Sequence, residues 1–273
     1  MKLQVRPILA KKNKRPVKSL LKALRILDKL GDCPGGSGIT EMSVALKTPK
    51  STIHRLIVTL EEAGYAIFDP LTSKYSLGNR VARLGEQLNQ QSPLLTFGVP
   101  MLEQLTRDCH EASHLAIMQG TEVVYISHEE SREPIRISFG MGHRAPVHCT
   151  ALGKAFLAGL SESEICMLYK NKKKLERITP NTVTSLRALL AEIAIVRKEG
   201  IAYDNEEYMT GLLCMAAPIR DFTSRIVAAM SLSMFKHKMT EKKKSFFTDA
   251  LWRVSMEMSE KLGFLPTSKK NGF

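Results

Sequence analysis

The sequence predicts an α+β protein of two domains, from two observations. Hydrophobic residues follow a helical spacing in the first third of the chain and then alternate between helix and strand patterns. Turn residues and charge divide the chain into segments. We expect a basic arm over 1–18, a small domain over 19–77, a linking helix over 78–92, a larger domain over 93–265 and a tail over 266–273.

Positive charge is concentrated near the N-terminus. Residues 1–91 hold 16 Lys and Arg against 7 Asp and Glu, whereas residues 92–273 hold 24 against 20. Such a basic segment is either a solvated tail or a contact surface for a polyanion such as nucleic acid or a membrane. No apolar run approaches the roughly 20 residues of a membrane span, and the N-terminus lacks the apolar stretch of a signal peptide. We therefore expect a cytoplasmic protein that does not bind membranes.

Three helices are predicted in the small domain. Leucine spacing over 20–30 predicts a first helix with Ser19 as its N-cap. Thr40 can cap a short second helix, and Pro49 can open the first turn of a third helix that ends at Gly64. All three predicted helices therefore lie between Ser19 and Gly64, a span that is shorter than an ordinary domain.

A β-hairpin is predicted immediately after the third helix. Short β-type runs over 65–69 and 74–77 flank a turn over 70–73 that contains proline and serine. Three helices followed by a hairpin is the pattern of a winged helix-turn-helix, in which the third helix reads DNA and the hairpin is the wing.

The third helix has one apolar stripe and one polar face. The stripe is expected to pack in the core and consists of Ile53, Leu56, Ile57 and Leu60. On the polar face Lys50 suits a phosphate, and Arg55 can bind a guanine with two hydrogen bonds. An ordinary amphipathic helix has the same division, but the short preceding helix, the hairpin and the positive charge favour DNA recognition. The predicted DNA contacts are Lys50, Ser51, Thr52, His54, Arg55, Thr59 and, on the wing, Lys74.

The larger domain begins after Ser92-Pro93 and interleaves helices with strands. Helices are expected over 94–110, 150–159, 162–170, 185–199 and 240–262, and strands over 112–119, 122–128, 134–139, 201–205, 213–219 and 226–234. Several strand pairs are hairpin-like, so a mainly antiparallel sheet flanked by helices fits best.

Several longer strings resemble one protein family. In the small domain they are SLLKALRILDKL, PKSTIHRL and LEEAGYAIFDPLTSKYSLG; in the larger domain they are GHRAPVHCTALGKAFLA, ITPNTVTS, GIAYDNEEYMTGLLCMAAPI and VAAMSLS. Together they resemble the IclR-type bacterial transcriptional regulators. The resemblance implies a winged helix-turn-helix domain, a linker helix and a GAF-like α/β effector-binding domain. It also implies homodimers, often dimers of dimers, on palindromic double-stranded DNA operators, with small organic or aromatic acids as effectors.

The resemblance also implies an effector pocket in the larger domain. Matched position by position, its residues are Met141, Gly142, Ala151, Leu152, Gly153, Asp204, Leu213, Cys214, Ser231 and Ser233. Backbone N–H groups at the helix start near Ala151 suit an anion. Two positions depart from the family pattern: Lys47-Thr48 stands where Gly-Leu is usual in the helix-turn-helix turn, and Met234-Phe235 stands where Gly-Pro is frequent. A lysine in a left-handed turn is uncommon, so this turn is expected to be tight or strained.

Three features of the larger domain can be explained without a ligand. Arg144 can pair with Glu206 or Glu207, Cys214 can be a core thiol, and the His148-Cys149 pair is expected to pack rather than react. Each of these residues can therefore be explained without a bound ligand.

Catalytic, metal-binding and purely structural functions are the other classes. Gly140-x-Gly142-x-x-Ala145 resembles a dinucleotide fingerprint, but Pro146 follows and no helix opens there. The five cysteines lack the spacing of disulfide frameworks and zinc sites, although a Cys–His hydrolase or a metal site assembled in space is not excluded by spacing. A purely structural nucleoid protein does not need a polar-lined pocket, so the pocket expected in the larger domain argues against this class. We predict a regulator that is not an enzyme and has no catalytic residues, metal or cofactor.

Overall fold

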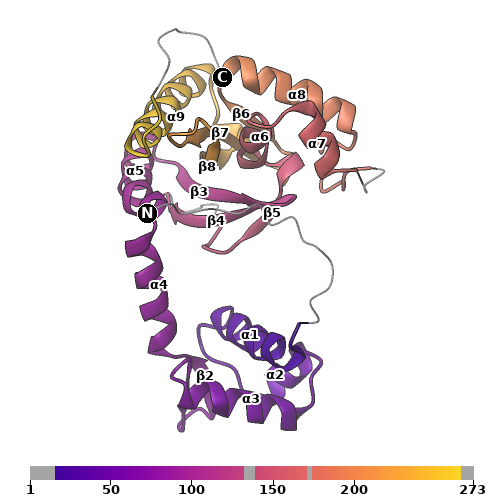
Figure 1. Cartoon of the computed structure of the whole chain (residues 1–273), viewed down its shortest axis with the longest axis vertical. Helices are drawn as coiled ribbons and strands as arrows, with labels where there is room; N and C mark the ends of the chain where they lie inside the picture. The colour runs from indigo at the N-terminus through magenta and orange to yellow at the C-terminus, as the bar shows by residue number, and fades with distance from the viewer. Residues whose placement is uncertain (1–15, 132–138, 171–173, 266–273) are drawn as a thin grey trace. The chain divides into compact units, whose positions relative to one another are not determined.

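The computed structural model describes residues 16–131, 139–170 and 174–265 (Figure 1). Most of the expected arm, the expected tail and all but the last residue of the strand expected over 134–139 lie outside these ranges. The chain divides into two compact units, 1–88 and 89–273, which are described separately below.

Up to Leu77, the first unit contains three helices and a two-stranded antiparallel sheet, as predicted. Its elements are α1 (Lys18–Gly31), α2 (Ile39–Ala45), α3 (Lys50–Glu62), β1 (Ala66–Asp69) and β2 (Lys74–Leu77). Its core joins α1, α2 and α3 to the hairpin through Ile26, Met42, Ile53, Ile57 and Tyr75. Helix α3 is therefore held by the rest of the unit through its apolar stripe.

The predicted helix caps are wrong in detail. Ser19 lies inside α1, which begins after Val17, and Thr40 lies inside α2. The carboxylate of Glu41 instead accepts hydrogen bonds from the Gly38 N–H (3.1 Å) and the Ser37 hydroxyl (3.2 Å), so an acidic side chain from the first turn satisfies this end of α2. At α3, Pro49 is the extended N-cap residue rather than the first helical residue.

The turn between α2 and α3 contains a lysine in the left-handed region. Lys47 has φ 48°, a conformation that costs little for glycine and more for lysine. Two hydrogen bonds close the turn around it: the Ser43 hydroxyl donates to the Thr48 carbonyl (2.7 Å), and the Thr48 N–H donates to the Ser43 carbonyl (3.1 Å). These bonds hold the turn in place although the usual glycine is missing.

The second unit is built around a six-stranded sheet, and every strand pair in it is antiparallel. The strand order is β5-β4-β3-β8-β7-β6. The strands are β3 (Ala112–Gln119), β4 (Glu122–Glu129), β5 (Arg144–Pro146), β6 (Ala202–Asn205), β7 (Leu212–Arg220) and β8 (Ile226–Phe235). The predicted antiparallel sheet is confirmed, and β5 is a strand that the sequence pattern did not reveal.

Helices cover both faces of this sheet (Figure 1). The covering helices are α5 (Pro93–Cys109), α6 (Ala151–Leu157), α7 (Glu162–Leu168), α8 (Leu186–Glu199) and α9 (Glu241–Lys261). The unit also has the short 3-10 turns η1 (Val147–Cys149) and η2 (Lys236–Lys238), and helix α4 (Asn79–Gln91) precedes α5 in the chain. Residues of α5 and α9 pack on one face, and residues of α6, α7 and α8 pack on the other. Helix α4 occupies the segment expected to link the domains, and the division between the two units falls within it, after Leu88. None of the helices in the described ranges is long and apolar enough to cross a bilayer.

Alternate residues of each strand enter different cores, because successive strand side chains point to opposite faces. On β7, Leu212 and Cys214 pack on the α6 side, whereas Leu213 and Met215 pack on the α5 and α9 side. This alternation decides which of the predicted pocket residues can meet.

Candidate nucleic-acid interface and small-molecule cavity

The polar face of α3 is open to solvent. Ile53 and Ile57 are fully buried, while Lys50, His54 and Arg55 are exposed on the other side of the helix. Ser51 and Thr59 are also exposed, and Thr52 is half-buried. Six of the seven predicted DNA contacts therefore lie on one helix, and each of them has at least part of its surface exposed to solvent.

Two of the predicted contacts already have partners within the protein. The Thr59 hydroxyl donates to the Arg55 carbonyl (2.9 Å), as serine and threonine often do inside helices. Lys74 lies 3.8 Å from a carboxylate oxygen of Glu41, the residue that caps α2. Both residues therefore have a structural role that does not require DNA.

The turn of the hairpin is organised by Asp69. Its carboxylate accepts hydrogen bonds from the Leu71 N–H (2.9 Å) and the Thr72 hydroxyl (2.7 Å). Leu71 at the tip is 94% exposed. Lys74 begins β2, so the charged residue of the wing lies at the edge of the turn rather than at its tip.

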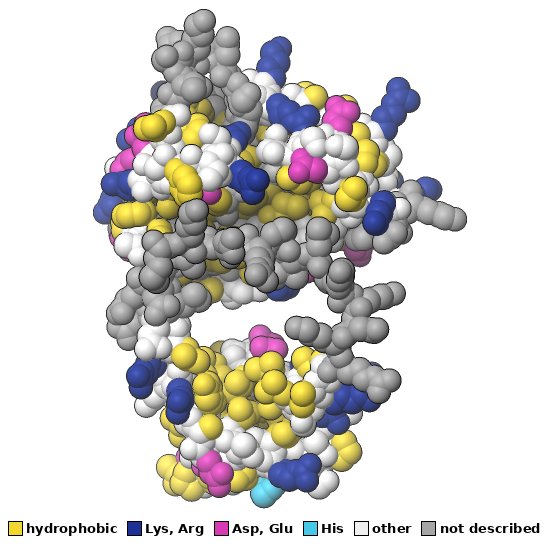
Figure 2. Space-filling model, viewed as in Figure 1, with side chains coloured by type: hydrophobic (Ala, Val, Ile, Leu, Met, Phe, Trp, Pro, Cys, Tyr) yellow, Lys and Arg dark blue, Asp and Glu magenta, His cyan; other side chains and the backbone are white. Residues whose placement is uncertain are grey.

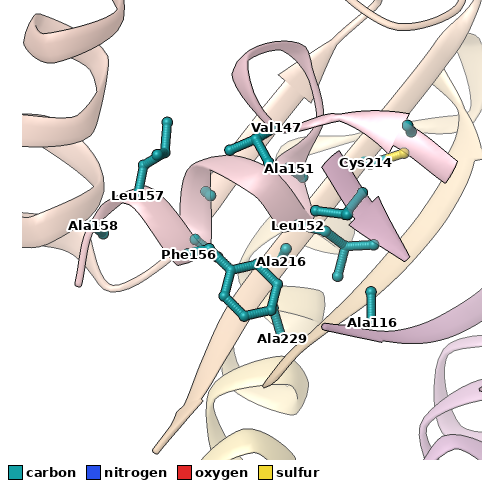
Figure 3. Packing of buried hydrophobic residues seen from close by; sticks show 14 of the residues in the cluster. Ala116, Val147, Ala151, Leu152, Phe156, Leu157, Ala158, Cys214, Ala216 and Ala229 are labelled. Atoms are coloured by element: carbon teal, nitrogen blue, oxygen red, sulfur yellow. The ribbon is translucent and has the colours of Figure 1, made fainter. Parts of the chain in front are cut away.

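A small cavity of about 10 Å³ lies in the second unit between the sheet and the start of α6. Its walls are Tyr125, Phe139, Thr150, Ala151, Leu152, Asp204, Tyr208, Leu212, Cys214 and Ser231. Figure 3 shows Leu152 and Cys214 close together in this packing. The cavity has room for about one water molecule, so a larger ligand requires the walls to move.

Half of the predicted pocket residues meet at this cavity: Ala151, Leu152, Asp204, Cys214 and Ser231. Sequence reasoning missed the other half of the walls, which includes the aromatic residues Tyr125, Phe139 and Tyr208. A signal for Tyr125 was available, because the alternation along 122–128 puts it on the same face as buried Val123. No local pattern pointed to Phe139 and Tyr208, which lie outside the regular elements.

The other five predicted residues do not line the cavity. Leu213 points to the opposite face of the sheet from Cys214, so the two adjacent residues cannot share one pocket. Met141 is 64% exposed, and Gly142 has φ 82° in a surface turn in which the His143 N–H donates to the Gly140 carbonyl. That glycine is therefore explained by the turn.

Gly153 and Ser233 are buried but have other neighbours. A Cβ atom at Gly153 would lie 2.1 Å from the carbonyl oxygen of Val147, so α6 and η1 touch at this residue. The Ser233 hydroxyl is 3.2 Å from the Cys214 sulfur and 3.4 Å from His114 Nδ1. Ser233 therefore lies behind the cavity wall.

The start of α6 is a weaker anion site than the sequence implied. The helix has seven residues, and the hydroxyl of its N-cap Thr150 accepts the Gly153 N–H (3.2 Å). A side-chain cap has thus taken one of the donors that an anion would need.

Asp204 is the acidic group of the cavity. One of its carboxylate oxygens accepts the N–H groups of Glu207 (2.7 Å) and Tyr208 (3.3 Å), which fixes the loop after β6. Burial raises the pKa of Asp204 to about 7, against the opposing effect of these two hydrogen bonds. The nearby ammonium group of Lys154 is already paired with Glu207 and Glu192.

An aromatic and histidine cluster stands beside the cavity. His114 is buried, its ring packs against Tyr125 and Phe139, and its Nε2 has no hydrogen-bond partner. Burial lowers the pKa of His114 to about 3, so this ring is neutral at physiological pH. His143 Nε2 is 2.9 Å from the Tyr208 hydroxyl, which ties the loop after β6 to the segment before β5.

The alternatives left open by the sequence are resolved by contacts. Arg144 pairs with Glu122 (3.0 Å) and Gln119 (2.8 Å), so the alternative pairing with Glu206 or Glu207 is wrong. His148 Nε2 is 2.9 Å from the Glu176 carbonyl. Burial raises the pKa of Cys149 to about 12, so it is a thiol rather than a reactive thiolate at neutral pH. Among the described residues no three His, Cys, Asp or Glu side chains form a group that could hold a metal.

A larger hollow of about 240 Å³ lies between α5 and α9. Its apolar floor includes Phe97 and Met101, and its charged rim includes Arg253, which pairs with Asp108 (3.2 Å). It lies on the other side of the sheet from the aromatic cluster, and its residues were not among those expected from the sequence.

Two family models cover most of the chain. One, for the bacterial transcriptional regulator IclR C-terminal region, matches residues 87–260, and one for the IclR helix-turn-helix domain matches residues 19–70. The chain belongs to the IclR family of bacterial transcriptional regulators. Both IclR regions thus coincide with the two structural units, and the resemblance and fold class predicted from the sequence are confirmed.

Individual IclR-family proteins match over nearly their whole length. The chain is 32% identical to the HTH-type transcriptional regulator XynR of Escherichia coli K12, over 91% of this chain and 98% of that protein. The crystal structure of Thermotoga maritima IclR shares 31% identity with a TM-score of 0.78, over 90% of this chain and 99% of that one. An IclR homologue from Microbacterium hydrocarbonoxydans, crystallised with 4-hydroxybenzoate, has the same fold at 21% identity and a TM-score of 0.75, over 90% and 99% of the two chains. The homologues are DNA-binding transcriptional regulators, a family without enzymatic activity.

Proposed function

We propose that this chain binds a palindromic operator as a homodimer or a dimer of dimers, and that a small organic or aromatic acid in the second unit controls its operator affinity. The observation that carries the proposal is an enclosed cavity with polar groups, Asp204 and Ser231, between the aromatic side chains of Tyr125 and Phe139. Small-ligand sites combine mostly apolar walls with a few polar groups in this way. The cavity belongs to a different unit from α3, so control of DNA binding must be allosteric.

Acid control is tested on the full chain. We expect one of acetate, pyruvate, succinate, benzoate or 4-hydroxybenzoate to bind by calorimetry and to change operator affinity by about 5–150-fold, the usual range of allosteric coupling. The coupling must be reciprocal, so saturating operator DNA must change the affinity for the same acid by the same factor. If an acid binds but operator affinity does not respond, control by that acid is refuted.

Arg55 is proposed to read a base and Lys50 to contact a phosphate. Arg55→Ala is expected to weaken specific binding by about 1–3 kcal/mol and to relax sequence preference, because a bidentate contact with guanine carries that much discrimination. Lys50→Ala is expected to weaken binding to all sequences about equally, because phosphates carry no sequence information. Binding-site selection with both variants measures the difference, and full sequence preference in Arg55→Ala contradicts the assignment.

A second copy is proposed to cover the exposed leucines of α1. Leu20 and Leu24 are 58% and 47% exposed, and Figure 2 shows hydrophobic side chains gathered over this part of the first unit. One recognition helix also contacts too few base pairs to select a single site in a genome. These two facts support a dimer that presents two recognition helices.

The dimer is tested by sedimentation at micromolar concentration. Leu24→Gln is expected to weaken association at least about tenfold, because burying one leucine contributes about 1.5–3 kcal/mol. Val44→Gln is the matched control, since Val44 is an exposed apolar residue on a different helix, α2. A monomeric wild-type chain, or equal effects of the two variants, argues against this interface.

A further inference from the structure

Asp204 is a buried carboxyl group that faces a small cavity without a cation in its walls. Its side chain is 1% exposed, and the described residues that line the cavity include no Lys, Arg or His. A carboxylate ligand placed beside an ionised Asp204 would meet a like charge in a site that excludes water. Two carboxylates within hydrogen-bond distance do not both stay ionised in such surroundings, because their repulsion is screened so little.

The groups that face Asp204 do not supply the missing positive charge. Lys154 of α6 is a cation whose charge acts on Asp204, and Glu207 and Glu192 already pair with it. The other titratable groups that act on Asp204 or are influenced by it are Glu207 and Tyr208 of its own loop, Tyr125 of β4, Cys149 of η1 and Cys214 of β7, with His143 bonded to Tyr208. Burial raises the pKa values of Tyr125, Cys149 and Cys214, so those three groups are neutral near pH 7.

The hydrogen bonds of Asp204 leave it suited to carry a proton. One oxygen, Oδ1, accepts both backbone N–H groups, from Glu207 and Tyr208, and so anchors the loop. The other oxygen can therefore hold a proton without disturbing that anchor. A carboxylic acid that donates to a carboxylate forms a strong charge-assisted hydrogen bond.

We propose that Asp204 binds the effector's carboxylate by donating a hydrogen bond from its own protonated carboxyl group, so that the effector anion is bound only together with one proton on Asp204. This inference rests on the proposed function, because it assumes that the effector is an acid. It makes Asp204 a selector for carboxylates, and it makes effector affinity depend on pH even for a monocarboxylate, whose own charge stays constant between pH 6 and pH 8.

The sign of the pH dependence follows from the burial of Asp204. With a pKa of about 7 in the empty cavity, the carboxyl group is mostly protonated at pH 6 and mostly ionised at pH 8. Above pH 7 the site must take up a proton before the anion can bind. Affinity for the acid is therefore expected to be about tenfold weaker at pH 8 than at pH 6.

The test is calorimetry on the full wild-type chain with 4-hydroxybenzoate and the other four acids of the panel at pH 6 and pH 8. At pH 8 the titration is repeated in buffers with different heats of ionisation, which gives the number of protons taken up. We expect about one proton per bound anion at pH 8 and close to none at pH 6. This measurement does not depend on any variant.

Asp204→Asn separates the proton from the shape of the side chain. The amide oxygen can still accept the two backbone N–H groups, and the amide nitrogen donates to a carboxylate at every pH. We expect this variant to bind the acid with the same affinity at pH 6 and pH 8 and without proton uptake. Asp249→Asn, an exposed change on α9, is the matched control and is expected to keep the wild-type pH dependence.

The outcomes distinguish this inference from the proposed function. If the wild-type chain binds an acid equally well at both pH values without proton uptake, the inference is overturned and the proposed function stands. If Asp204→Asn keeps the tenfold pH dependence, another group carries the proton and the inference is also overturned. If no acid of the panel binds at pH 6, where the proton is already present, both the inference and acid control are overturned.

Discussion

Operator affinity of the full chain is expected to fall by roughly 10³ to 10⁵ between 50 and 200 mM salt, provided that 6–10 phosphates are contacted. The reason is charge: residues 1–91 carry 16 Lys and Arg against 7 Asp and Glu, and Lys50 and Arg55 are exposed on α3. Each neutralised phosphate releases counterions, and that gain shrinks as salt rises. Fluorescence anisotropy with labelled operator at a series of salt concentrations measures the slope.

The slope also has a residue-level control. Lys50→Ala is expected to reduce the slope by about one, since the counterion contribution of one phosphate disappears with the lysine charge. Lys198→Ala removes an exposed charge from α8 in the second unit and is expected to leave the slope unchanged. An operator affinity that is flat with salt would refute phosphate contacts as the main source of affinity.

Gly153→Ala is expected to destabilise the second unit by about 3 kcal/mol or more. The added Cβ would lie 2.1 Å from the Val147 carbonyl oxygen, and a backbone atom cannot rotate away as a side chain does. Figure 3 shows Val147 beside Ala151 at the start of α6, where Leu152 and Phe156 extend toward the sheet alanines Ala216 and Ala229. Separating α6 from η1 therefore also disturbs the wall of the cavity.

The matched control for this substitution is Gly85→Ala on α4, where an added Cβ meets nothing within 4 Å. Alanine is favoured over glycine inside helices, so this change is expected to be neutral or to stabilise by up to about 1 kcal/mol. Urea unfolding followed by circular dichroism measures both variants. Equal stability of Gly153→Ala and wild type would show that η1 can move away from α6 at little cost.

Local sequence patterns were sufficient for most of the fold. The helical spacing that ends at Gly64 and the turn residues over 70–73 predicted α3 and the hairpin, because these elements depend on hydrogen bonds and side chains near in sequence. Caps were less predictable: Glu41 rather than Thr40 caps α2, since α2 begins one residue before Thr40 and the Glu41 side chain reaches back to the Gly38 N–H. The strand β5 was missed because three residues are too few for a periodic pattern.

The cavity shows where sequence reasoning ends. The family resemblance predicted that Asp204, Cys214 and Ser231 belong to one site. All three line the cavity, because their side chains lie on the same face of the sheet. Leu213 does not line this cavity, since a one-residue step along a strand reverses the direction of a side chain. Phe139 and Tyr208 come from irregular segments, so only the folded chain could place them against the strands.

The sequence by itself determined that this chain resembles the IclR-type regulators, with a predicted DNA-reading helix that begins at Pro49 and ends at Gly64 and an α/β domain later in the chain, because periodicity, turn residues and long family strings are local properties. Only the tertiary structure decided the protonation of the site. Whether Asp204 is ionised depends on burial, on the two N–H groups of its own loop and on the neutralisation of Lys154 by Glu207 and Glu192. These groups are separated along the chain and meet only in the fold, and electrostatic interactions depend on distance in space and on the exclusion of water.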